Sequence, residues 1–136
     1  MRTESRARAR ALQALYAWDI RVNEPLERVA ERVWDDLAVS AEERQFAGML
    51  IRTFLKSGEQ IDRQLADVTT NWRLSRLGVI ERSVLRLAAA EFTQGTTPPR
   101  VVIKESMRLA ERYGSADSAR FVNGVLDAYA RRTGLL

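Results

Sequence analysis

The chain has 136 residues, of which 46% are hydrophobic and 29% are charged, and its formal net charge is +4. It contains no Cys and no His, which excludes disulfides, thiolate chemistry, Cys/His zinc sites and imidazole acid–base catalysis. No hydrophobic run approaches the ~18 residues of a membrane helix, and the start lacks the apolar region of a signal peptide. We therefore expect one globular domain in a reducing compartment.

Helical patterns follow one another from the start of the chain. Residues 3–20 are rich in Ala, Leu and Arg, and "NEP" at 23–25 ends this pattern. A hydrophobic stripe with helical spacing then runs from Leu26 to Leu37, and Pro25 suits the first turn of a helix. The sequence thus predicts two helices in its first 37 residues.

The third helical pattern begins with "SAEE" at 40–43. This motif predicts a capping box, in which the Ser40 hydroxyl accepts a backbone N–H and Glu43 reaches back. The hydrophobic residues that follow fall on two sides, which predicts that this helix packs against two neighbours. Gly58 predicts the end of the helix, and another helical pattern continues to Trp72.

The second half of the chain predicts three long helices. "NWRLSRLG" at 71–78 resembles a short helical turn, and a hydrophobic face then extends from Ile80 to Glu91. "TQGTTPP" at 93–99 is the clearest loop, and its prolines suit the start of the next helix. After a turn at 113–118, the last helix runs over about 117–131. No segment alternates hydrophobic and polar residues as a strand does, so we predict an all-α fold.

Charge is distributed unevenly along the chain. Residues 1–23 and 73–136 carry a net positive charge, whereas residues 24–43 are strongly acidic. A basic surface of this kind indicates a polyanionic partner, most commonly a nucleic acid.

Arginines in the first predicted helix gather on one side. Arg2, Arg6 and Arg10 recur every four residues, roughly opposite Leu15. Guanidinium groups bind phosphates and stack on bases, although most charged stripes are solvated helix faces. Cations at this spacing repel one another unless an anion lies near them.

Phe121 and Gly124 are unusual in the last predicted helix. Phe121 lies about 100° from the centre of the hydrophobic stripe, so it is either exposed and able to stack on an unpaired base, or packed on a neighbouring helix. Gly124 costs about 1 kcal/mol relative to Ala in a helix, which predicts that another backbone approaches it closely.

Glu91 is the strongest candidate for acid–base chemistry. It lies on a hydrophobic face, where an ionised carboxylate needs a partner. The alternative is a structural Glu bonded to an Arg or a helix N-terminus, and Glu105 could be a similar structural partner. We find no catalytic, cofactor or metal site, and we predict that the chain is not an enzyme.

Three segments carry a specific resemblance. "RARARALQALYAW" at 6–18, "GVIERSVLRLAAAEF" at 78–92 and "PRVVIKESMRLAERYGSADSARFVNGVLD" at 99–127 resemble the NusB family of bacterial transcription antitermination factors. The resemblance extends from near residue 6 to about 130 and is weakest between 22 and 72.

The resemblance implies a fold and a function. It implies a compact bundle of about seven helices in a single domain, with two small lobes at about 1–57 and 58–136. It also implies a cytoplasmic, non-enzymatic protein that binds boxA single-stranded RNA of ribosomal-RNA leaders together with NusE, a small-subunit ribosomal protein. Other Nus factors and RNA polymerase are further implied partners, and self-association is possible.

Individual positions take implied roles from the same resemblance. RNA contacts are implied for the arginine-rich helix and for the turn and aromatic residue of the last helix, namely Arg6, Arg8, Arg10, Asp117, Ser118 and Phe121. Arg2 is a further RNA-contact candidate, because it shares the charged side of the first helix with Arg6 and Arg10. Tyr16 and Glu81 correspond to positions associated with NusE docking.

Two alternatives remain for the function. One is the RNA-binding front domain of an rRNA cytosine methyltransferase, although a chain that ends at Leu136 leaves no room for a catalytic domain. The other is a helical module that only docks proteins.

Overall fold

We describe the chain from a computed structural model, which covers residues 2–21, 23–69 and 77–136 apart from the side chain of Arg2. These residues form six helices and no strand. The helices are α1 (Arg2–Ile20), α2 (Leu26–Asp36), α3 (Ala41–Val68), α4 (Val79–Gln94), α5 (Pro99–Tyr113) and α6 (Ala116–Arg132).

The all-α prediction is confirmed, but α3 differs from expectation. The sequence predicted a helix end at Gly58, whereas α3 continues from Ala41 to Val68. Phe54 and Ile61 are buried on either side of Gly58, so packing holds both halves in one helix. A Cβ at Gly58 would lie 3.6 Å from the Phe54 ring, an ordinary contact. The short turn predicted at 71–78 falls largely outside the described residues.

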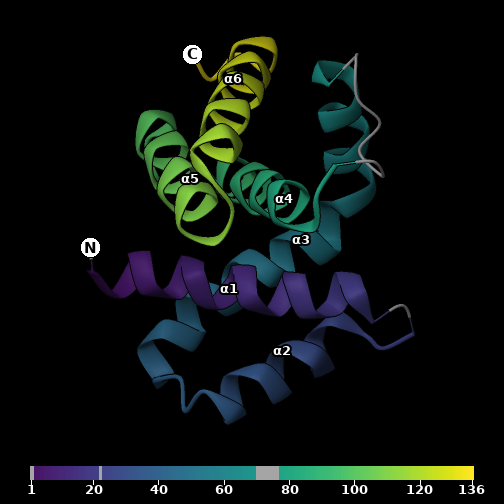
Figure 1. Cartoon of the computed structure of the whole chain (residues 1–136), viewed down its shortest axis with the longest axis vertical. Helices are drawn as coiled ribbons and strands as arrows, with labels where there is room; N and C mark the ends of the chain where they lie inside the picture. The colour runs from purple at the N-terminus through teal and green to yellow at the C-terminus, as the bar shows by residue number, and fades with distance from the viewer. Residues whose placement is uncertain (1, 22, 70–76) are drawn as a thin grey trace.

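Helix α4 forms the centre of the bundle. It packs against α1, α3, α5 and α6, and Figure 1 shows it between α5 and α6 on one side and α3 on the other. Residues 83–85 and 87–92 are all buried. Each large apolar side chain buried in this way contributes about 1.5–3 kcal/mol relative to exposure. This centre fixes the positions of the surrounding helices.

The helices divide between two ends of the molecule. Figure 1 shows α1 and α2 in the lower part and α4, α5 and α6 in the upper part, while α3 runs along both. The predicted lobe boundary between residues 57 and 58 lies inside α3. No helix among the described residues is both long and apolar enough to cross a membrane.

Local signals set several helix starts correctly. Pro25 is the N-cap of α2, and α5 begins at Pro99. The Ser40 hydroxyl accepts from the backbone N–H of Glu43 at 3.2 Å, and Ser115 accepts from that of Ser118 at 3.1 Å. The carboxylate of Glu43 does not complete the predicted capping box with the backbone, because it pairs with two arginines of α1.

Candidate nucleic-acid interface

Arg8 lies inside the bundle, where only 4% of it is exposed. Its Nε and Nη2 donate to the two carboxylate oxygens of Glu91 at 2.8 and 2.6 Å, and its Nη1 donates to Glu105 at 3.2 Å. Its guanidinium carbon lies 5.2 Å from the centroid of the Phe46 ring. One side chain of α1 therefore contacts α3, α4 and α5. This burial leaves Arg8 almost no surface for RNA, so the contact implied for it stays a prediction that the geometry does not support.

The charges of this cluster compensate one another. Burial alone would lower the pKa of Arg8, but its hydrogen bonds to Glu91 and the charges of Glu91 and Glu105 raise it. Ser5 donates to Glu105 at 2.5 Å as well. The structural interpretation of Glu91 and Glu105 is confirmed. Their carboxylates hold α1 in place and are not poised for acid–base catalysis.

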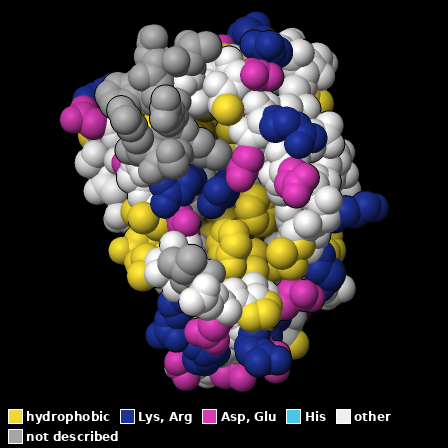
Figure 2. Space-filling view, turned by 90° about the vertical axis from the view of Figure 1, so that its right-hand side faces the viewer, with side chains coloured by type: hydrophobic (Ala, Val, Ile, Leu, Met, Phe, Trp, Pro, Cys, Tyr) yellow, Lys and Arg dark blue, Asp and Glu magenta, His cyan; other side chains and the backbone are white. Residues whose placement is uncertain are grey.

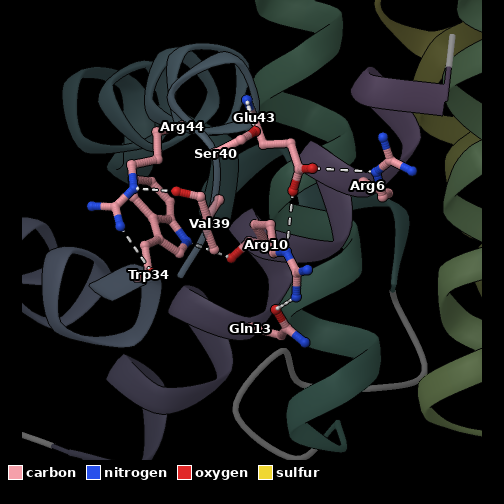
Figure 3. A network of polar contacts seen from close by, with 8 residues as sticks. All are labelled: Arg6, Arg10, Gln13, Trp34, Val39, Ser40, Glu43 and Arg44. Carbon is pink, nitrogen blue, oxygen red and sulfur yellow. Dashed lines mark hydrogen bonds and ion pairs between the residues drawn. The ribbon is translucent and has the colours of Figure 1, made fainter. Parts of the chain in front are cut away.

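Arg6 and Arg10 face the other way and share a different carboxylate. Figure 3 shows the Glu43 side chain between them: its Oε2 lies 3.2 Å from Arg6 Nε and its Oε1 lies 3.3 Å from Arg10 Nε. Glu43 thus supplies the anion that relieves repulsion along this stripe. The Arg6 side chain remains 61% exposed, so its remaining N–H donors reach solvent.

A groove of about 580 Å³ separates α1 from the C-terminal half of α5. Its lining residues are Ser5, Arg6, Ala9, Arg10, Glu105, Arg108, Leu109, Glu111, Arg112 and Tyr113. Four arginines, two on each wall, outnumber the two glutamates. Because Glu105 is already occupied by Arg8, the groove favours an anionic ligand.

The α5 wall of this groove was not predicted. Arg108 pairs with Glu105 at 3.5 Å, and the Arg112 guanidinium lies 5.4 Å from the centroid of the Tyr113 ring. The signal in the sequence was the spacing of four residues between Arg108 and Arg112, which places them on one side of a helix.

The first turn of α6 holds two predicted RNA contacts, Asp117 and Ser118, in different environments. Asp117 is exposed and pairs with Arg120. Ser118 is buried, and its hydroxyl lies 3.1 Å from that of Ser115 and donates to Glu81 of α4. Ser118 therefore links α6 to α4. Its burial leaves little surface for RNA, so the contact implied for it stays a prediction that the geometry does not support.

Phe121 lies between the two alternatives that the sequence left open. Its side chain is partly buried and packs against the core, so the ring is neither sealed inside nor fully exposed. Gly124, one turn further along α6, has nothing within 4 Å of the position that a Cβ would occupy. The predicted close approach of another backbone at Gly124 is therefore wrong, and this side of α6 is bare next to Phe121.

The C-terminal end of α1 contributes an apolar surface. Tyr16 and Ile20, one turn apart, are 40% and 55% exposed. Figure 2 shows hydrophobic side chains gathered across the middle of the face that carries this end of the molecule. Asp19 pairs with Arg82 at 2.6 Å, which joins the last turn of α1 to the first turn of α4, where Glu81 lies. Tyr16 and Glu81 thus lie on adjoining helices.

Arg2 is the first residue of α1. Its side chain lies outside the described residues, so its predicted RNA contact stays a prediction. The described residues bring together Arg6 and Arg10 in the groove, and separate Arg8 and Ser118 from it.

Comparison with known proteins decides which family this architecture represents. The family model for the NusB family matches residues 5–131. The chain belongs to the NusB family. This assignment confirms the resemblance seen in the three sequence segments, and it confirms that the chain is not an enzyme, because the family is one of antitermination factors.

Curated relatives and solved structures agree with this assignment. The transcription antitermination protein NusB of Anaeromyxobacter dehalogenans is 41% identical over 127 residues, which cover 93% of this chain and 89% of that protein. A structure of T. maritima NusB is 33% identical, with a TM-score of 0.87, covering 94% of this chain and 90% of that chain.

A second structural relative contains ligands. It is a crystal structure of the antitermination factors NusB and NusE in complex with double-stranded RNA, and its matching chain is 30% identical with a TM-score of 0.87. The match covers 97% of this chain and 98% of that one. The helical fold is therefore shared along almost the whole length.

Proposed function

We propose that this chain is a transcription antitermination factor that binds boxA RNA of ribosomal-RNA leaders together with NusE. Its binding role rests on one observation, the groove between α1 and α5 with Arg6 and Arg10 on one wall and Arg108 and Arg112 on the other. Guanidinium groups bind phosphate oxygens in a forked geometry, and several of them together give salt-dependent affinity. Membership of the NusB family supports the proposal independently.

Asp117 and Phe121 extend this site along α6. Tyr113 lines the groove, and α6 begins three residues later, so the first turns of α6 start close to the edge of the groove. The partly exposed Phe121 ring and the bare surface at Gly124 leave room for an unpaired base to stack. An exposed carboxylate at Asp117 can accept a hydrogen bond from a base amino group.

NusE docking is proposed for the end of α1 and the start of α4. Tyr16 and Ile20 offer exposed apolar surface there, and apolar and aromatic anchors dominate most protein interfaces. Glu81 contributes through its position on α4, although its carboxylate is already engaged by Ser118. We further propose that the chain has two small lobes and is cytoplasmic. We also propose that it contacts other Nus factors and RNA polymerase.

The test is a titration of the purified chain into labelled boxA RNA. Fluorescence anisotropy is measured with and without NusE, on the single strand and on a duplex of the same sequence. We expect the single strand to bind more tightly than a scrambled strand, with a gain in affinity when NusE is added. The duplex arm is included because the structural relative was solved with double-stranded RNA.

Two results would contradict the proposal. Equal affinity for boxA and scrambled RNA in the presence of NusE would show that binding is not sequence-specific, which contradicts the proposed recognition of boxA. Binding of NusE without any binding of RNA would instead favour a module that only docks proteins.

A further inference from the structure

Helix α5 carries a basic stripe that the proposed RNA site uses only in part. Arg100, Lys104, Arg108 and Arg112 recur every four residues, and all four are exposed. Residues at this spacing lie on one side of a helix, in successive turns. Arg108 and Arg112 line the groove, whereas Arg100 and Lys104 lie beyond it on the same helix. We define these four residues as the α5 stripe.

The α5 stripe is poorly neutralised. Of the four residues in the α5 stripe, only Arg108 has an ion pair within the described parts of the chain. It pairs with Glu105 at 3.5 Å, and Glu105 also pairs with the buried Arg8. Like charges four residues apart destabilise a helix slightly. The exposed Arg120 and Arg131 of α6, in contrast, pair with Asp117 and Asp127, which lie three and four residues away in sequence. An external anion would relieve the repulsion along α5.

We propose that the α5 stripe carries RNA that flanks the boxA element, continuing the RNA path out of the groove. This inference rests on the proposed function. Three of the four cations are arginines, whose planar forks match phosphate oxygens. The stripe extends ~18 Å at 1.5 Å per residue, which is long enough to follow several consecutive phosphates of one strand. Its continuity with the arginines of α1 favours RNA over an acidic protein.

The experiment uses a double variant outside the groove, Arg100→Gln with Lys104→Gln. Neither residue has an ion pair within the described chain, and Gln is a good helix former, so the fold should be retained. The matched control is Lys56→Gln with Arg63→Gln, which removes the same charge from exposed positions of α3. Thermal unfolding followed by circular dichroism checks that both variants fold like the parent chain.

Three labelled single strands are compared by anisotropy at several salt concentrations, in the presence of NusE. They are the boxA element alone, the element extended by ~8 nucleotides on its 5′ side, and the element extended equally on its 3′ side. We expect the α5 variant to bind the element alone normally and to bind one extended strand about fivefold more weakly. The salt dependence should fall by about 1.4, since each phosphate contact on a single strand contributes ~0.7.

Other outcomes overturn the inference in distinguishable ways. If the α5 variant matches the α3 control on all three strands, or if neither extension improves binding by the parent chain, the stripe does not bind flanking RNA and the proposed function stands. A labelled poly-glutamate peptide is titrated in parallel. If the α5 variant loses affinity for this peptide and for none of the RNA strands, the stripe binds an acidic protein. If the parent chain does not bind even the element with NusE, the proposed function itself fails.

Discussion

Arginines on two sides of α1 have different environments, one buried in the bundle and the other at the groove. Arg8 points inward, is 4% exposed, and binds Glu91 of α4 and Glu105 of α5. Arg6 and Arg10 point to the groove, pair with one carboxylate between them, and keep part of their surface in solvent. An arginine whose donors are all engaged by buried carboxylates stabilises the fold, whereas one with spare donors at a groove can bind phosphate.

Helix α6 repeats this division with uncharged residues. Val122 is fully buried, while its neighbour Phe121 is only partly covered and Gly124 leaves the adjoining surface bare. The "FVNG" segment at 121–124 therefore places one residue in the core and two at the surface within one helical turn. In both helices the interior side is fully packed and the outer side keeps the chemistry that a ligand needs.

The largest expected effect is on the interior side of α1. Arg8→Met leaves Glu91 and Glu105 buried without their cation, and breaking a buried pair in this way costs about 3–5 kcal/mol. Urea unfolding measures the loss. Arg6→Met is the control, because the Arg6 side chain is 61% exposed and Glu43 keeps Arg10 as a partner. Its loss should therefore stay near that of solvent-exposed pairs, about 0–1 kcal/mol. Equal losses in the two variants would contradict the distinction between the two sides.

The next effect concerns the ring at position 121. Phe121→Ala should weaken RNA binding by about 1–3 kcal/mol, which corresponds to about fivefold to 150-fold, through lost stacking on a base. Because the ring also packs on the core, Phe121→Leu serves as the control that keeps apolar volume and removes the aromatic face. If Phe121→Leu binds RNA like the parent chain, the ring acts only in packing.

A smaller effect is expected at the groove. Arg10→Ala should lower the salt dependence of RNA binding by about 0.7, the contribution of one phosphate contact on a single strand. Arg63→Ala removes the same charge from an exposed site on α3 and should leave this dependence unchanged. Affinities at a series of salt concentrations give the slope, and an unaltered slope for Arg10→Ala would argue against a phosphate contact there.

The smallest effect separates stability from binding at Gly124. Gly124→Ala should raise the free energy of unfolding by about 1 kcal/mol, because Ala is the better helix former and the Cβ meets no neighbour. The added methyl group should nevertheless weaken RNA binding a few-fold if a base lies across this surface. Paired measurements of thermal unfolding and anisotropy are needed, and a variant that is more stable and binds equally well would place the RNA elsewhere.

Much of the fold was predictable because its signals are local. Prolines at the starts of α2 and α5, and Ser40 and Ser115 at helix caps, act through their own backbone and their nearest neighbours. The error at Gly58 had the opposite origin. A glycine weakens a helix locally, but buried residues on both sides of it hold α3 in one piece.

The sequence by itself determined the helices, most of their starts, the family, and the side of α1 on which Arg6 and Arg10 lie, because periodicity and caps depend on residues a few positions apart. Only the tertiary structure decided that Arg8 and Ser118 are structural. Their partners Glu91, Glu105 and Glu81 lie far away in sequence. It also decided that α5 forms the second wall of the groove. Whether a side chain's hydrogen-bonding groups are engaged depends on partners that are distant in sequence, and a local sequence pattern does not show whether such partners are present.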